Sequence, residues 1–182
     1  MHSAHFASRR KGFALCLTIV AATVLSNSSL VSAEDWGQFR GPNCSGVSNS
    51  KASLPTRFSA TNNVRWSQDL GDGIGSPVVA AGRVFVSAMA DEKNVGLYAF
   101  DVKTGKNIWA RTWPAGDLPS VHKTNSHAAT TPAADADRVY FYFSTLGLIA
   151  LDAKTGEDVW KLKVPTPYFV FKWGPGMSPT LY

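Results

Sequence analysis

The strongest constraint on the fold of this chain is an internal repeat. An eleven-residue stretch that begins at Ala99 recurs 51 residues later, beginning at Ala150, and both copies read Ala-x-Asp-x-x-Thr-Gly-x-x-x-Trp. A Ser-Pro or Thr-Pro pair precedes each copy and occurs a third time near the C-terminus, at Ser76-Pro77, Thr131-Pro132 and Ser178-Pro179. A repeat of about 50 residues is typical of folds that stack copies of one supersecondary unit.

The segments between these marks predict short strands. Residues 83–87 and 138–143 are rich in Val, Phe and Tyr, and residues 96–101 and 147–152 are nearly continuous apolar runs. Each run is about six residues long and is bounded by turn residues, which favours strands over helices. Because the apolar runs do not alternate with polar residues, we expect these strands to be covered on both faces.

Each unit therefore predicts four antiparallel strands, which is the pattern of a β-propeller blade. We expect an all-β partial propeller, with blade one at about 75–112, blade two at about 130–164 and a third blade that starts at about 177. Residues 63–70 resemble the fourth strand of a blade and predict an orphan outer strand. Residues 34–62 then form a loop-rich N-terminal extension. A β-sandwich is the structural alternative, but it gives no reason to repeat an eleven-residue motif.

Each position of the repeated motif has a physical role in a tight turn between the third and fourth strands. The Asp and Thr side chains can accept or donate hydrogen bonds within the turn, and the Gly supplies a positive φ. The Trp offers a flat surface to the neighbouring blade, which we favour over ligand binding. The small Ala leaves room for close packing. The structural residues so predicted are Ala99, Asp101, Thr104, Gly105, Trp109, Ala150, Asp152, Thr155, Gly156 and Trp160.

This motif resembles the tryptophan-docking motif of PQQ-type, or quinoprotein alcohol dehydrogenase-like, propeller repeats, and the resemblance covers about residues 63–182. It implies the propeller fold strongly and the function weakly. Such repeats occur in PQQ-dependent dehydrogenases, in the propeller subunit of the outer-membrane β-barrel assembly machinery, and in many exported proteins. The opening stretch, Asp35 to Pro42, resembles the start of that third, uncharacterised group.

The N-terminus predicts export. Basic residues at positions 9–11 precede an apolar run from Phe13 to about Leu25, and small residues stand before Glu34. This order is typical of a secretory signal that is removed, and the run is shorter than the ~20 residues that a membrane-spanning anchor needs. We therefore expect residues 1–33 to be a signal peptide and the mature chain to be periplasmic or secreted, with no membrane span. Whether the signal uses the Sec or the twin-arginine route stays open.

Composition excludes one class of partner. Three of the 18 Lys and Arg residues lie in the predicted signal, whereas all 13 Asp and Glu residues follow it. The mature chain is therefore close to neutral and has no run of basic residues, so we infer no nucleic-acid partner. Cys44 is the one cysteine after the predicted signal, so the mature chain is not expected to contain an intrachain disulfide.

Two connections between repeat units hold the candidate ligand contacts: His122, Asn125 and His127 in the first, Lys172 and Trp173 in the second. Connections of this kind lie at one end of a propeller, near the channel, where ligands commonly bind. Two His residues five apart suggest a metal pair, but no third ligand is evident. A solvated loop is the alternative for the first connection, and packing against the N-terminal extension is the alternative for the second.

The function that we predict is an exported, non-catalytic propeller scaffold that binds a protein or polysaccharide partner. The alternative is the N-terminal fragment of a PQQ-dependent quinoprotein oxidoreductase with its active-site residues in further blades. The resemblance implies that such an enzyme uses PQQ, calcium held by Glu, Asn and Asp, an adjacent Cys-Cys pair and an Asp base. No such set is evident in this sequence, so we predict no catalytic or metal residue. A propeller needs about four to eight blades, so we expect this chain alone to self-associate.

Overall fold

A computed structural model describes residues 34–182 of the chain. The predicted signal peptide, residues 1–33, lies outside the described residues. No helix within the described part is long and apolar enough to cross a membrane.

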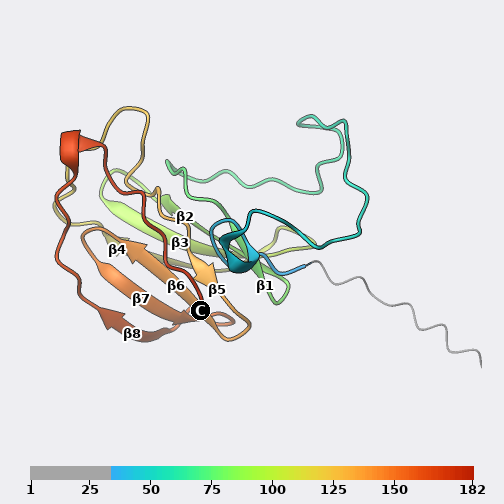
Figure 1. Cartoon of the computed structure of the whole chain (residues 1–182). Helices are drawn as coiled ribbons and strands as arrows, with labels where there is room; N and C mark the ends of the chain where they lie inside the picture. The colour runs from blue at the N-terminus through green and yellow to red at the C-terminus, as the bar shows by residue number, and fades with distance from the viewer. Residues whose placement is uncertain (1–33) are drawn as a thin grey trace, which may run out of the picture. The chain divides into compact units, whose positions relative to one another are not determined.

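The described chain forms two four-stranded antiparallel sheets, each a meander of consecutive strands (Figure 1). The first sheet consists of β1 (Val78–Ala80), β2 (Arg83–Met89), β3 (Asn94–Asp101) and β4 (Asn107–Pro114). The second consists of β5 (Ala133–Ala134), β6 (Arg138–Phe143), β7 (Gly147–Asp152) and β8 (Asp158–Leu162). Two short 3-10 segments, η1 (Pro42–Cys44) and η2 (Val170–Lys172), are the only helical elements in residues 34–182. The prediction of an all-β fold with four-stranded antiparallel blades is confirmed.

The hairpin between β1 and β2 shows why the sequence turns at this point. Ala81 and Gly82 both have positive φ, 47° and 76°, which is the backbone of a two-residue hairpin turn that matches strand twist. In the second sheet the side chain of Asp135 makes the corresponding turn, because its carboxylate accepts hydrogen bonds from the amides of Asp137 and Arg138, both at 2.8 Å. Different turn chemistry thus gives the same hairpin.

One hydrophobic core joins the two sheets. Buried side chains of the first sheet meet those of the second, as where the ring of Trp113 stacks on Phe141 with centroids 5.9 Å apart. In β3 the consecutive residues Val95, Gly96 and Leu97 are all buried. Successive residues of a strand point to opposite faces, so β3 is covered on both faces, as its unbroken apolar run predicts.

The structure differs from the sequence prediction at both ends of the repeat array. Residues 63–70 form no strand, although an outer strand is expected there, and residues 178–182 form none either. A strand is defined by its backbone ladder, and neither segment pairs with any of the described strands. Both segments instead use side-chain hydrogen bonds to reach the sheets.

Candidate functional site

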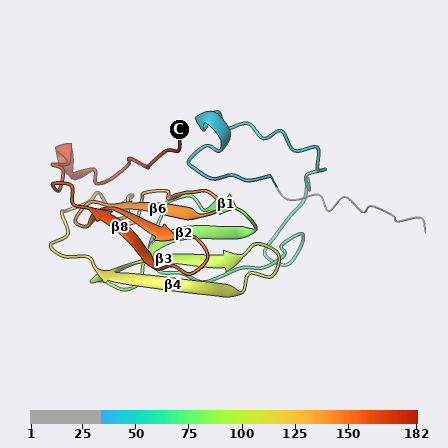
Figure 2. The same cartoon turned by 90° about the horizontal axis from the view of Figure 1, so that it is seen from below.

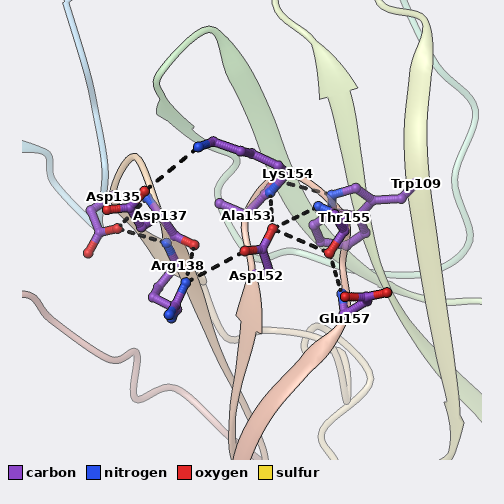
Figure 3. Close-up of polar contacts among 9 residues, drawn as sticks. All are labelled: Trp109, Asp135, Asp137, Arg138, Asp152, Ala153, Lys154, Thr155 and Glu157. Carbon is purple, nitrogen blue, oxygen red and sulfur yellow. Dashed lines mark hydrogen bonds and ion pairs between the residues drawn. The ribbon is translucent and has the colours of Figure 1, made fainter.

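The turn between β7 and β8 is organised around the carboxylate of Asp152 (Figure 3). One oxygen, Oδ1, accepts hydrogen bonds from the amides of Lys154 and Thr155 at 2.8 and 2.9 Å, and from the Thr155 hydroxyl at 3.3 Å. The other oxygen lies 3.6 Å from Nη1 of Arg138. These bonds, led by that from the Thr155 amide, hold the pKa of Asp152 below its ordinary value of 3.8.

The turn between β3 and β4 repeats this arrangement. Asp101 Oδ1 accepts hydrogen bonds from the amides of Lys103 and Thr104 and from the Thr104 hydroxyl, at 3.1, 2.8 and 2.8 Å. The bond from the Thr104 hydroxyl is the first cause of the lowered pKa of Asp101. Gly105 closes the turn at φ 70°, as Gly156 does at φ 72°. The two copies of the motif therefore fold alike.

A Trp from the preceding segment lies over each of these turns. The indole nitrogen of Trp109, on β4, donates a hydrogen bond of 3.2 Å to the carbonyl oxygen of Ala153 (Figure 3). Its ring covers Gly156, where an added Cβ would lie 2.7 Å from the ring. Trp66 makes the corresponding 3.0 Å bond to Val102 and covers Gly105 in the same way. Trp66 thus occupies this position without being part of a strand.

Residues two positions after each Trp also contact the turn, and the motif did not predict them. Arg111 donates a 2.5 Å hydrogen bond to the carbonyl of Gly156 and forms a 3.1 Å ion pair with Asp158. Gln68 donates a 3.0 Å bond to the carbonyl of Gly105. Residues i and i+2 of an extended segment share a face. A long polar donor two residues after Trp66 and Trp109 is therefore the sequence signal that could have identified these turn contacts.

The small Ala of each motif copy stands directly opposite its Trp. In the sheet register Ala99 pairs with Trp109 and Ala150 with Trp160, and both Ala residues are fully buried. The two Trp side chains differ in burial, because Trp109 is 8% exposed and Trp160 is 42% exposed. Trp109 is covered by the second sheet, whereas every residue of β8 is exposed.

The two connections with candidate ligand contacts meet in space. The rings of His122 and Trp173 lie with centroids 4.5 Å apart. Asn125 donates hydrogen bonds from Nδ2 to the carbonyl oxygens of Trp173 at 2.5 Å and Pro175 at 3.2 Å. We call this surface, formed by residues 119–125 and 167–175, the ledge. Its second segment packs on the first connection, and these bonds do not involve the N-terminal extension.

Exposed aromatic side chains project from the ledge. Tyr168 is 88% exposed and Phe171 is 83% exposed. Lys172 lies beside a shallow pocket of about 210 Å³ that both connections line, the first with Pro119 and Ser120. Phe171 and Lys172 have positive φ, 53° and 59°, a strained conformation for residues with side chains. The ledge therefore presents Tyr168 and Phe171 outside any sheet, Phe171 within η2.

His127 lies apart from His122 and faces a different cavity, of about 450 Å³. Asp72, Asp91 and Glu92 contribute acidic side chains to its lining. Burial lowers the pKa of His127, and the nearby Asp72 carboxylate offsets this in part. His122 instead bonds through Nδ1 with the Thr124 hydroxyl at 2.8 Å. The structure does not bring the two His residues together as a metal pair.

The ionisable side chains that most often hold metal ions do not cluster in the described part of the chain. No group of three or more His, Cys, Asp and Glu side chains that could hold a metal ion occurs in residues 34–182. Cys44 lies 3.5 Å from Gln38 Nε2 and has no adjacent cysteine. We therefore derive no chemical step through PQQ or calcium for this part of the chain.

Comparison with known proteins gives a matching family model and two relatives. A family model described as outer membrane protein assembly factor BamB matches residues 55–168. A polyvinylalcohol dehydrogenase from a Pseudomonas species is 29% identical over 104 residues, which cover 56% of this chain and 15% of that protein. Outer membrane protein assembly factor BamB from Alteromonas naphthalenivorans is 27% identical over 119 residues, which cover 58% of this chain and 28% of the relative.

Solved structures also resemble parts of the chain. A europium-containing methanol dehydrogenase matches with a TM-score of 0.40 and 22% identity, covering 52% of this chain and 16% of the other. A quinohemoprotein alcohol dehydrogenase, ADHIIG from Pseudomonas putida HK5, matches with a TM-score of 0.32 and 22% identity, covering 46% and 12%. The chain spans less than a third of the length of each of these relatives and structures.

Proposed function

The chain belongs to the protein family described as outer membrane protein assembly factor BamB, and we propose that it acts as an exported, non-catalytic propeller scaffold that binds a protein partner through the ledge. Membership of this family confirms the resemblance to PQQ-type repeat proteins that the docking motif predicts. Under this proposal residues 1–33 direct export, and the mature chain works in the periplasm or outside the cell.

The observation that carries the proposal is that the ledge combines internal hydrogen bonds with exposed aromatic side chains. Asn125 fixes the backbone at Trp173 and Pro175, while Tyr168 and Phe171 remain almost fully exposed. Aromatic side chains are enriched in protein interfaces, and rigid ones lose little conformational entropy when they bind. A loop that is held by hydrogen bonds and exposes aromatic rings is therefore suited to bind a protein surface.

Photo-crosslinking from the ledge tests this proposal. A photoreactive amino acid placed at Tyr168 in cells should give a discrete protein adduct. Phe171→Ser in the same chain should lower the yield of this adduct by about tenfold, the effect of losing near 1.4 kcal/mol of binding free energy. Phe58→Ser is the matched control, because Phe58 is 75% exposed but lies outside the ledge. Adducts that are equally weakened by both substitutions, or a product that consists of polysaccharide, would contradict a protein partner.

A second candidate function rests on the 29% identity with polyvinylalcohol dehydrogenase. In that case the chain is part of a quinoprotein oxidoreductase whose cofactor residues stand outside residues 34–182. Calorimetric titration of the complete protein with PQQ and Ca²⁺ distinguishes the two functions. Saturable binding of PQQ would favour the oxidoreductase, and no heat of binding, with the crosslink retained, would favour the scaffold.

A further inference from the structure

Three consecutive residues of the N-terminal extension contact three consecutive repeat units. Trp36 exchanges two backbone hydrogen bonds with Val79 of β1, at 2.7 and 3.0 Å. The carbonyl oxygen of Gly37 accepts a 2.7 Å bond from the amide of Ala134 in β5. The side-chain oxygen of Gln38 accepts a 2.7 Å bond from the amide of Leu181. Figure 2 shows the start of the described chain and the C-terminus on the same side of the sheets.

The three contacted residues are equivalent positions of the repeat. Val79, Ala134 and Leu181 each stand two residues after the Pro of the Ser-Pro or Thr-Pro mark. A second set of bonds links the same units at these marks. The amide of Ser76 donates to the Thr131 hydroxyl at 2.9 Å, and the amide of Thr131 donates to the Ser178 hydroxyl at 3.0 Å. Successive units are therefore in register where the extension crosses them.

Two of the contacted residues, Val79 and Ala134, belong to strand edges that would otherwise be unpaired. β1 and β5 are the first strands of their sheets, and each has a neighbouring strand on one side only. Edge strands present free N–H and C=O groups that attract another extended chain. The extension satisfies these groups through main-chain bonds, so the interaction does not depend on large apolar side chains.

Gly37 is the one residue in this crossing that must lack a side chain. An added Cβ at Gly37 would overlap the carbonyl oxygen of Ala134, and backbone atoms cannot move aside as a flexible side chain can. On either side, Trp36 and Gln38 are fixed locally. The Trp36 ring packs on Gly41, and Gln38 Nε2 donates a 3.1 Å bond to the Gly41 carbonyl. Contacts with Gly41 thus hold Trp36 and Gln38 in place on either side of Gly37.

We propose that the free edges of consecutive first strands form a binding site for an extended peptide with a central glycine, and that residues 35–38 are its resident occupant. One residue of the peptide is held by each repeat unit. The segment thereby fixes the register of neighbouring units at their first strands. Trp66 and Trp109 act at the other edge of each sheet, on the turn between the third and fourth strands.

The test is to cut the link between the segment and the sheets. Residues 48–56 are all exposed, so a protease recognition sequence inserted there in the intact chain is accessible. After cleavage, the N-terminal piece should remain bound to the repeats during gel filtration, and mass spectrometry should recover both pieces in one peak. Loss of the N-terminal piece from the cleaved parent protein would overturn the proposal.

Substitutions show whether the bonds described here are responsible for retention. Gly37→Ala should release the piece, whereas Gly176→Ala should not, because a Cβ at Gly176 has no atom within 4 Å and no unusual φ is required. Gln38→Ala adds no volume but removes both the acceptor for the Leu181 amide and the donor to the Gly41 carbonyl. It should speed release by at least about three- to tenfold, the usual net value of one hydrogen bond. Equal retention by Gly37→Ala and Gly176→Ala would overturn the assignment of the site.

Hydrogen exchange keeps the test decisive if the insertion disturbs folding. In the uncut Gly37→Ala chain the amides of Val79 and Ala134 should exchange faster than in the parent, while the amide of Tyr98 in β3 should not. Unchanged protection at Val79 and Ala134 would contradict the proposal. None of these readouts depends on the ledge, so failure here and failure of the proposed function are separate results.

Discussion

Replacing Trp109 by Ala should cost far more stability than the same change at Trp160, although both residues hold the same position of the motif. Trp109 is 8% exposed, contacts Phe85 with ring centroids 5.8 Å apart, and bonds to Ala153. Removal of a buried aromatic side chain costs about 3–5 kcal/mol, and the Ala153 carbonyl also loses its partner. Since a domain has only about 5–15 kcal/mol of stability, Trp109→Ala should be close to unfolding.

Trp160 provides the matched comparison because it is 42% exposed. Complete burial of a large apolar side chain contributes roughly 1.5–3 kcal/mol, so partial burial implies a cost of about 1–2 kcal/mol for Trp160→Ala. Urea denaturation followed by far-UV circular dichroism measures both, and an unchanged slope would show that the same transition is compared. Equal losses for the two variants, or a larger loss for Trp160→Ala, would refute the view that docking on Gly156 supplies the stability.

Two further predictions concern the turn and the cavity. Gly156→Ala should destabilise the chain by about 1–3 kcal/mol, the cost of a non-glycine residue at positive φ, with added strain against Trp109. Thermal unfolding measures this loss, and the control Gly176→Ala should unfold like the parent. A Gly156→Ala chain as stable as the parent would contradict the docking geometry. Burial depresses the pKa of His127 in the folded chain below its ordinary value of 6.5. Near and below that pH the unfolded chain therefore binds more protons than the folded chain, and the stability of the fold decreases as the solution is acidified from neutral. His127→Gln should abolish this part of the slope in urea midpoints measured between about pH 7.5 and 5.5, and an identical slope in the variant would exclude His127 as its source.

The parts of the fold that sequence predicted well depend on local signals. Residues 138–143 and 147–152 are expected strands and are β6 and β7 of the structure. Their limits are marked by turn residues close in sequence, such as Asp135 before β6 and Gly147, with its positive φ, at the start of β7. Apolar runs and turn chemistry therefore suffice to locate a blade's central hairpin.

The parts that sequence missed depend on distant main-chain contacts. The sequence predicts only a loop-rich extension, because the bonds of the extension to Val79 and Ala134 use backbone groups, which any residue possesses. Residues 63–70 carry the Trp that predicts an outer strand but form none. Docking of Trp66 requires only one side chain in the right place, and the motif encodes that side chain. A strand also requires a partner strand to hydrogen-bond with, which the motif does not encode.

The bonds between equivalent positions of the repeats have a consequence for synthesis on the ribosome. The Ser76 amide finds its acceptor 55 residues later, at Thr131, and Thr131 finds its own 47 residues later, at Ser178. The Trp109 indole likewise meets Ala153 44 residues further on. Each unit therefore obtains some of its hydrogen bonds only from the unit translated after it. During synthesis, the last unit to emerge still lacks these bonds. A ribosome that pauses between Trp109 and Ala153 holds that indole uncovered for the length of the pause.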